Sequence, residues 1–173
     1  MNVSAQPQGG LAIPFDHVRL DRLMEQAGID LLLATSKHNV QYLLGGHRAN
    51  FFDYMDATGI TRYLPVLVYA KGKPEKAAYI GHRLETFQHQ AKPLWTPETQ
   101  TASNTSTEAM QKAVDYMKKA GMKPKRIATE FGFLPYDASK VLRAGHYDVQ
   151  LDFATGGVNL DWVFVRKSST ACP

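Results

Sequence analysis

Cysteine and long apolar runs are both scarce in this sequence. Its 173 residues include a single cysteine, Cys172, so no disulfide forms within the chain, which favours a reducing cytoplasm. No apolar run approaches the roughly 18 residues that a membrane-spanning helix needs. The polar segment 1–10 lacks the basic start and apolar stretch of a secretory signal. We therefore expect a cytoplasmic location and no membrane partner.

Motifs that would identify an enzyme are also missing. The glycine pairs at 45–46 and 156–157 lack the spacing and the lysine of a phosphate-binding loop, and no Gly-x-Ser-x-Gly nucleophile motif occurs. Asp30 and Glu130 border predicted strands, where a ribonuclease H-like nuclease would place acids. Acids also occur there as caps and turn residues, and no third acid completes such a site. A nuclease is therefore the least favoured interpretation.

Two groups of residues have the chemistry of metal ligands. His82, Glu85 and His89 are spaced for one helical face, although a polar face in solvent is the more common reason for such spacing. A second, looser group comprises His47, Asp53 and Asp56. Neither group has the spacing of an established zinc motif, so we expect no metal in this chain.

The chain carries a net charge of +4 and has a pI near 9.1. Its basic residues gather in one stretch, at Lys118, Lys119, Lys123, Lys125 and Arg126. Such a cluster is typical of a phosphate-binding patch, but a solvated helix end explains it equally well because cations suit the helix dipole. No aromatic residues are interleaved with it, and we expect no nucleic-acid partner.

Helical and strand patterns alternate along the sequence. We predict helices over 14–27, 83–90, 105–120 and 137–144, with Asp137 as a cap of the last. We also predict a short helix that either Ser36 or Asn39 caps and that the glycine pair at 45–46 ends. We predict strands over 31–35, 65–70, 76–80, 126–129 and 149–153, and a short extended piece at Leu94 and Trp95. This order indicates an α/β fold with a mixed sheet and helices packed on it in three layers.

Four segments, in this order and spacing, resemble the amino-terminal domain of the creatinase/prolidase (Xaa-Pro peptidase) family. The helix and strand over 19–33 are similar to the family's opening. Residues 39–45, Asn-Val-Gln-Tyr-Leu-Leu-Gly, are similar to its Asn-x-x-Tyr-Leu-x-Gly signature. Residues 126–130 resemble its short strand ending in Glu, and residues 162–168 resemble the segment that leads into its catalytic domain.

The resemblance implies a ribonuclease H-like domain over 14–168, flanked by a disordered tail at 1–13 and a short tail at 169–173. It also implies a catalytic domain of pita-bread fold, absent from this sequence, that holds two divalent metals (Mn, Co or Zn) in the peptidases. No catalytic residue or metal ligand is thus assigned to this chain, which we expect to be inactive alone. The parent hydrolase would be a dipeptidase, an aminopeptidase or creatinase-like.

In that family the amino-terminal domain supports dimerisation and borders the active site, partly that of the neighbouring subunit. The expected partners are therefore the chain's own catalytic domain and a second copy. The irregular segment 47–62 supplies the substrate-contacting candidates, which are His47, Arg48, Phe51, Phe52 and Tyr54. Two alternatives stay open: these aromatics fill the core, or the chain is a stand-alone small-molecule-binding or regulatory module.

Overall fold

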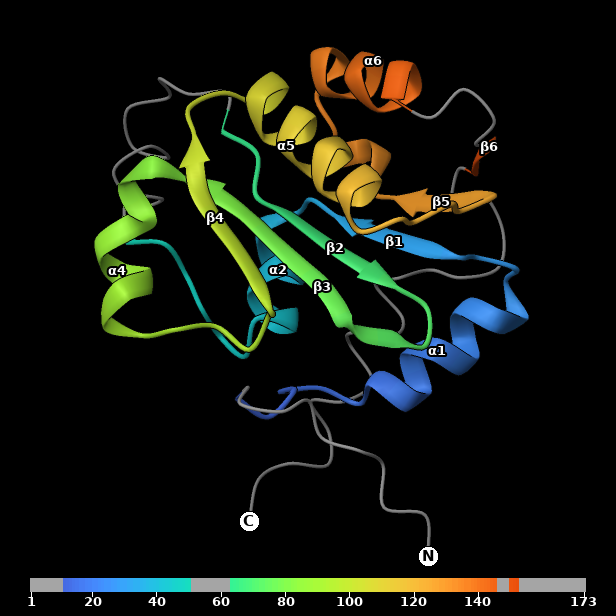
Figure 1. The fold of residues 1–173 in the computed structure, drawn as a ribbon, viewed down its shortest axis with the longest axis horizontal. Helices are drawn as coiled ribbons and strands as arrows, with labels where there is room; N and C mark the ends of the chain where they lie inside the picture. The colour runs from blue at the N-terminus through green and yellow to red at the C-terminus, as the bar shows by residue number, and fades with distance from the viewer. Residues whose placement is uncertain (1–10, 51–62, 146–149, 153–173) are drawn as a thin grey trace, which may run out of the picture.

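The computed structural model describes residues 11–50, 63–145 and 150–152, and these build a six-stranded sheet in the order β4-β3-β2-β1-β5-β6 (Figure 1). The strands are β1 (Leu31–Ala34), β2 (Val66–Ala70), β3 (Lys73–His82), β4 (Glu98–Ser103), β5 (Arg126–Thr129) and β6 (Gln150–Asp152). β2 is antiparallel to both β1 and β3. The pairs β3–β4, β1–β5 and β5–β6 are parallel, so the sheet is mixed as predicted.

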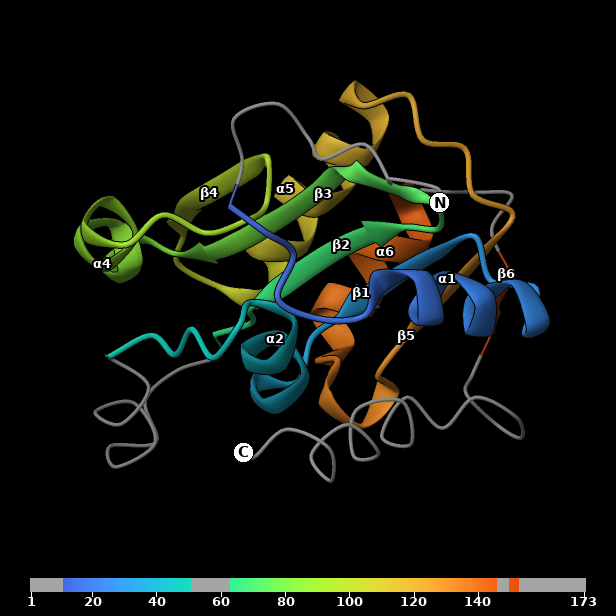
Figure 2. The same cartoon turned by 90° about the horizontal axis from the view of Figure 1, so that it is seen from below.

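Helices cover both faces of this sheet (Figures 1 and 2). One face carries α1 (His17–Gln26) and α2 (Lys37–Leu43), and the other carries α5 (Ser106–Lys119) and α6 (Tyr136–Gly145). The short helices η1 (Arg83–Glu85) and α4 (Thr86–Ala91) follow β3, and η2 (Phe131–Phe133) follows β5. The predicted three-layer α/β class is confirmed. No helix in the described part of the chain has both the length and the apolar character needed to span a membrane.

The alternation of side chains along β1 divides the core in two. Leu32 and Ala34 face α1 and α2, whereas Leu31 and Leu33 face α5 and α6. All four are at most 1% exposed, which explains why the strand is a continuous apolar run. Burying one such leucine stabilises the fold by roughly 2 kcal/mol. Because its side chains alternate between the two cores, β1 is the central element of both.

Polar side chains cap the starts of α2 and α5. Ser36 accepts a hydrogen bond from the Asn39 N–H and caps α2, and Thr105 caps α5 in the same way. The predicted cap at Asp137 is wrong because α6 begins one residue earlier, at Tyr136. The Asp137 carboxylate instead accepts hydrogen bonds from two hydroxyls at the start of α5, at 2.7 and 2.9 Å, and so ties the two helices together.

The predicted extended piece at Leu94 and Trp95 is also wrong. The strand in this region is β4, which begins at Glu98 and runs parallel to β3 at the edge of the sheet. An edge strand tolerates a partly exposed polar sequence of this kind, in which we predicted no strand. Trp95 is buried instead, and its indole N–H donates to the Leu43 carbonyl at 2.7 Å.

The two glycines after α2 differ in how much space surrounds them. Gly45 and Gly46 both have a positive φ, 67° and 89°. A Cβ on Gly45 would lie 2.8 Å from the Cβ of Pro14, whereas a Cβ on Gly46 would meet nothing within 4 Å. The first glycine is therefore required by the packing of the chain before α1 as well as by its own backbone angle.

This difference gives a matched pair of substitutions. Gly46→Ala should lower the free energy of unfolding by about 1 kcal/mol, because only the left-handed backbone is strained. Gly45→Ala should cost about 2–4 kcal/mol, because overpacking against Pro14 adds to the same strain. Urea denaturation of both variants measures the difference, and equal losses would show that the Pro14 contact is unimportant.

Candidate functional site

Glu85, the last residue of η1, has a carboxylate that is fully buried. Four residues from separate parts of the chain surround it: His47 after α2, Tyr63 before β2, Tyr79 in β3 and His82 at the end of β3. We call these five residues the Glu85 cluster. They join the sheet to the beginning of the segment from which the sequence predicts substrate contacts.

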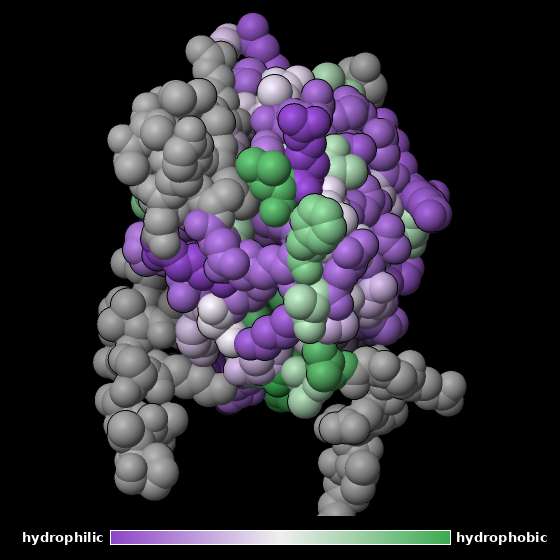
Figure 3. Space-filling model, turned by 90° about the vertical axis from the view of Figure 1, so that its left-hand side faces the viewer, coloured by the Kyte–Doolittle hydropathy of each residue, from purple (hydrophilic) through white to green (hydrophobic). Residues whose placement is uncertain are grey.

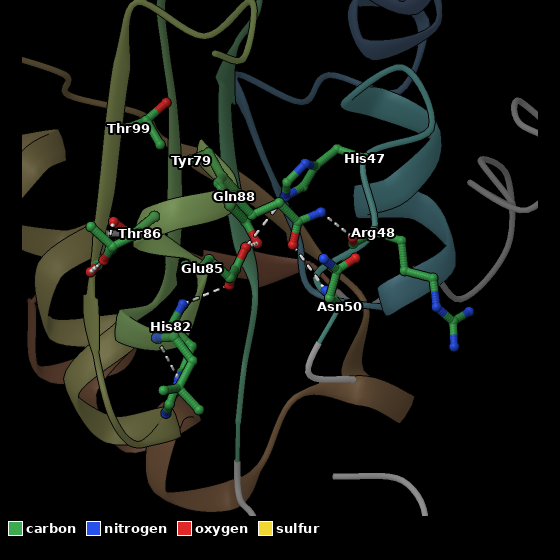
Figure 4. Close-up of polar contacts among 12 residues, drawn as sticks. His47, Arg48, Asn50, Tyr79, His82, Glu85, Thr86, Gln88 and Thr99 are labelled. Atoms are coloured by element: carbon green, nitrogen blue, oxygen red, sulfur yellow. Dashed lines mark hydrogen bonds and ion pairs between the residues drawn. The ribbon is translucent and has the colours of Figure 1, made fainter. Parts of the chain in front are cut away.

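The hydrogen bonds of the cluster occupy both carboxylate oxygens (Figure 4). Oε1 accepts from the Tyr63 hydroxyl at 2.6 Å and from the His82 backbone N–H at 2.7 Å. Oε2 accepts from the Tyr79 hydroxyl at 2.8 Å and lies 3.4 Å from Nε2 of His47. Such a set of donors is what a buried charge requires, since an unpaired one would cost several kcal/mol.

The cluster changes the acidity of its members. Burial by itself would raise the pKa of the Glu85 carboxyl, but the surrounding donors outweigh burial and hold that pKa below its usual value. Burial, reinforced by the Glu85 charge, raises the pKa of Tyr63 and Tyr79 well above the ordinary tyrosine range. At neutral pH the carboxylate is thus ionised and both tyrosines keep the protons that they donate.

The backbone of β3 leaves room for this carboxylate only at a glycine. A Cβ on Gly81 would lie 2.7 Å from Oε1 of Glu85 and 2.9 Å from the ring of Tyr79. Both of these side chains are buried and hydrogen-bonded, and so have little freedom to move. Gly81 is therefore part of the cluster's architecture although it makes none of its hydrogen bonds.

Gln88 of α4 holds the segment that begins at His47. Its side-chain N–H donates to the Arg48 carbonyl at 2.6 Å, and its oxygen accepts from the Asn50 N–H at 2.9 Å (Figure 4). Two bonds to one amide fix the backbone on both sides of residue 49. Residues 47–50 are consequently positioned by α4 and by the Glu85 cluster together.

His47 and Arg48, the two substrate-contacting candidates that the structure describes, point in different directions. His47 is 8% exposed and turned into the Glu85 cluster, whereas the exposed Arg48 side chain points away from it (Figure 4). Phe51, Phe52 and Tyr54 lie outside the described residues. Substrate contact by these five residues stays a prediction, with His47 in a supporting position and Arg48 at the surface.

The candidate metal group of His82, Glu85 and His89 does not converge. Glu85 turns into the core, while Nδ1 of His82 accepts a hydrogen bond from the Leu84 N–H at 3.2 Å and caps η1. The alternative of a solvated polar face is wrong for Glu85 too, because its side chain is buried. Across residues 11–50, 63–145 and 150–152, no group of three histidines, cysteines or acids is arranged to hold a metal. Asp53 and Asp56 lie outside these ranges.

Asp30 and Glu130 lie at opposite ends of the sheet. Asp30 precedes β1 and Glu130 follows β5, and these strands are parallel with Leu31 opposite Ile127. The Glu130 carboxylate accepts from the backbone N–H groups of Thr35 and Ser36 at 2.7 and 2.8 Å. The two acids therefore share no site, and the arrangement that a nuclease needs is not formed.

The side chain of Asn39 also donates to Glu130, as does the Ser36 hydroxyl at 2.6 Å. The motif over 39–45 thus meets the strand ending at 130, although about 90 residues separate them in sequence. This contact closes the β1–α2 connection onto β5. The motif residues that sequence analysis singled out are held together in space, and their described role is structural.

Sequence analysis missed Tyr63, Tyr79 and Gln88. Tyr63 follows an irregular stretch of the sequence. Tyr79 fits the pattern of an ordinary strand residue, and Gln88 fits that of an ordinary helix residue. Of the cluster itself, His47, His82 and Glu85 were noted from the sequence. The signal that identifies the two tyrosines is their position around one buried charge, which local periodicity does not contain.

Comparison with known proteins places the chain among peptidase-related domains. The family model described as Creatinase/Prolidase N-terminal domain matches residues 17–158. The resemblance inferred from the sequence motifs is thereby confirmed. No curated protein matches the chain closely enough to count as a relative.

Several solved structures share the fold at low sequence identity. The N-terminal domain of a Xaa-Pro dipeptidase from Lactobacillus brevis has a TM-score of 0.59 and 14% identity, covering 79% of this chain and 92% of that one. A proline dipeptidase from Streptococcus pneumoniae has a TM-score of 0.60 and 14% identity, covering 90% and 98%. A Xaa-Pro dipeptidase from Bacillus anthracis has a TM-score of 0.51 and 18% identity, and the match spans 79% of this chain but only 31% of that one.

Replacement of the buried carboxylate tests the cluster. Glu85→Gln should lower the free energy of unfolding at pH 7 by about 2–4 kcal/mol, because an amide cannot accept from all of the donors. Since the folded-state pKa of Glu85 is lowered, its contribution is complete above the unfolded-state value of about 4.3 and is lost as pH falls through the folded-state pKa. The difference in free energy of unfolding between wild type and Glu85→Gln should therefore become smaller at acid pH.

Urea denaturation between pH 7 and pH 3 measures this gap. The matched control is Glu75→Gln, the same change at an exposed position of β3. We expect less than about 0.5 kcal/mol from the control. A loss that does not vary with pH, or equal losses in the two variants, would contradict the role assigned to Glu85.

Proposed function

Because the chain belongs to the creatinase/prolidase N-terminal domain family, we propose that it is the non-catalytic amino-terminal part of a Xaa-Pro dipeptidase, aminopeptidase or creatinase-like hydrolase. In this proposal the chain packs against the parent's own catalytic domain and against a second subunit. The two divalent metals belong to that catalytic domain, and this chain gates the access of substrate to them.

The observation that carries the proposal is the rigid presentation of Arg48. Gln88 fixes the backbone on both sides of residue 49, and the Arg48 side chain extends outward from it (Figure 4). A guanidinium on a backbone fixed in this way suits the carboxylate of a short peptide or of creatine, which a guanidinium can bind through two parallel hydrogen bonds. A fixed backbone also lowers the entropy that is lost when the contact forms.

An apolar surface beside Arg48 supports contact with another domain or subunit. Leu84 and Phe87, three residues apart, are 57% and 84% exposed. Phe87 precedes Gln88, so this surface and the Arg48 segment belong to one helix-and-loop unit. α4 lies on the left in Figure 1, and Figure 3, which views the molecule from that side, shows hydrophobic side chains in a broken strip between hydrophilic ones. Exposed aromatic groups of this kind are typical of protein interfaces.

The cytoplasm is the compartment that fits this proposal. The sequence has one cysteine, which is typical of chains that work in a reducing environment. A structurally similar domain belongs to a cytoplasmic peptidase, PepQ of Mycobacterium tuberculosis. Fractionation of cells that produce the parent protein measures this directly.

The absence of catalytic residues is tested with the purified chain. It should release no proline from Gly-Pro or Leu-Pro, with or without Mn²⁺ or Co²⁺, because the proposal places every metal ligand elsewhere. Proline release is measured colorimetrically, beside a full-length Xaa-Pro dipeptidase as the positive control. Turnover above that of a mock purification would overturn the proposal.

Self-association tests the proposed subunit contact. Sedimentation equilibrium should detect a concentration-dependent dimer that Leu84→Ser/Phe87→Ser weakens about tenfold or more, since interface aromatics commonly contribute over 1 kcal/mol each. Phe133→Ser is the control, because Phe133 is 59% exposed in η2, outside the α4 region. A monomer at all concentrations, or equal weakening by the control, would contradict the dimer.

A further inference from the structure

Five lysines surround a hollow at the end of β3 opposite to the Glu85 cluster. Lys71, Lys73 and Lys76 come from the β2–β3 hairpin, and Lys123 and Lys125 from the connection between α5 and β5. Together with Asp30 they line a space of about 400 Å³, which we call the lysine hollow. Only the α5–β5 part of this basic surface was evident in the sequence.

Backbone hydrogen bonds fix the walls of the lysine hollow. The Asp30 N–H donates to the Arg126 carbonyl, and the Asp30 carbonyl accepts from the Lys71 N–H, both at 3.0 Å. The Asp30 carboxylate in turn accepts from the Lys125 and Arg126 N–H groups at 2.8 and 3.1 Å. Residue 30 therefore ties the hairpin to the α5–β5 connection, and the hollow is part of the folded framework.

Of the five lysines that line the lysine hollow, two have hydrogen-bond or ion-pair partners among the described residues. Lys71 lies 2.5 Å from a Glu25 oxygen and 3.9 Å from an Asp30 oxygen, and Lys76 donates to the Ala120 carbonyl at 2.9 Å. The remaining lysines are exposed, and their ammonium groups form no hydrogen bond or ion pair with the residues that the structure describes. These are Lys73, Lys123 and Lys125. Three cations around one hollow repel each other, and an anion between them would relieve that repulsion.

The helix dipole does not account for these three lysines. Lys118 and Lys119 occupy the last turn of α5, where cations suit the carbonyl end. Lys123 and Lys125 lie beyond the helix, and Lys73 comes from a different element. Their convergence is a product of the tertiary fold, so a solvated helix end explains only part of the basic cluster.

We propose that the lysine hollow binds a small anion with two or more negative charges, such as a pyrophosphate or a phosphate ester. Its volume is within the range of about 300–1,000 Å³ that is usual for small-ligand sites. Ammonium groups bind phosphate oxygens as point charges, without the fixed geometry of a guanidinium. The site is independent of the proposed peptidase role, because it lies at the other end of β3 from Arg48.

Titration of inorganic pyrophosphate into the 173-residue chain at low ionic strength tests this site. Calorimetry should give saturable binding, and nuclear magnetic resonance should show shifted amide signals over 71–76 and 121–126. Lys123→Gln/Lys125→Gln should weaken binding about tenfold or more, since both charges face the hollow. Lys118→Gln/Lys119→Gln removes the same charge from the adjacent helix end and should weaken it less than about threefold.

Three outcomes would overturn the proposal. The first is no saturable binding of pyrophosphate, and the second is an equal loss of affinity in the two double variants. The third is a single-stranded oligonucleotide that binds more tightly than pyrophosphate and is weakened equally by both variants, which would identify a general basic surface. All four lysines are exposed, so melting temperatures near that of wild type should confirm that both variants fold.

Discussion

The charge of Glu85 is the constraint on which the candidate site depends. A buried carboxylate is tolerated only where donors surround it, and here they come from β3, from the chain before β2 and from the segment after α2. Each donor must therefore be in place before the charge is stable. α4, which directly follows Glu85, is positioned by the same requirement, and through Gln88 it fixes the backbone beside Arg48.

Local sequence rules predicted the elements whose determinants are local. The strand predicted over 31–35 and the helix predicted over 105–120 depend on patterns within a few residues, and the structure confirms both as β1 and α5. β4 was missed because an edge strand keeps polar residues that also suit a loop. Glu85 was misjudged for a different reason: a helical pattern places it beside His82 and His89, whereas its burial is decided by the packing of Tyr63 and Tyr79.

The contact between Asn39 and Glu130 explains why the family was recognisable and its substrate was not. These two residues belong to motifs far apart in sequence, yet one hydrogen bond joins them and closes the β1–α2 connection onto β5. A motif whose role is to stabilise a chain connection carries information about the fold and none about the ligand. The motifs therefore identify an architecture shared at 14% identity, while the residues predicted to contact substrate lie outside them, in the segment that follows Gly45.

The direction of β3 places the two candidate surfaces at opposite ends of one strand. At its end lie the Glu85 cluster and α4, and at its beginning lies the lysine hollow. Between them the strand pairs with β2 on one side and with β4 on the other, so the two surfaces are joined by a continuous part of the sheet. Charge at the lysine hollow is also screened over a Debye length of about 10 Å in ordinary buffers. Screening therefore weakens the direct electrostatic effect that an anion bound there would have on the Arg48 guanidinium.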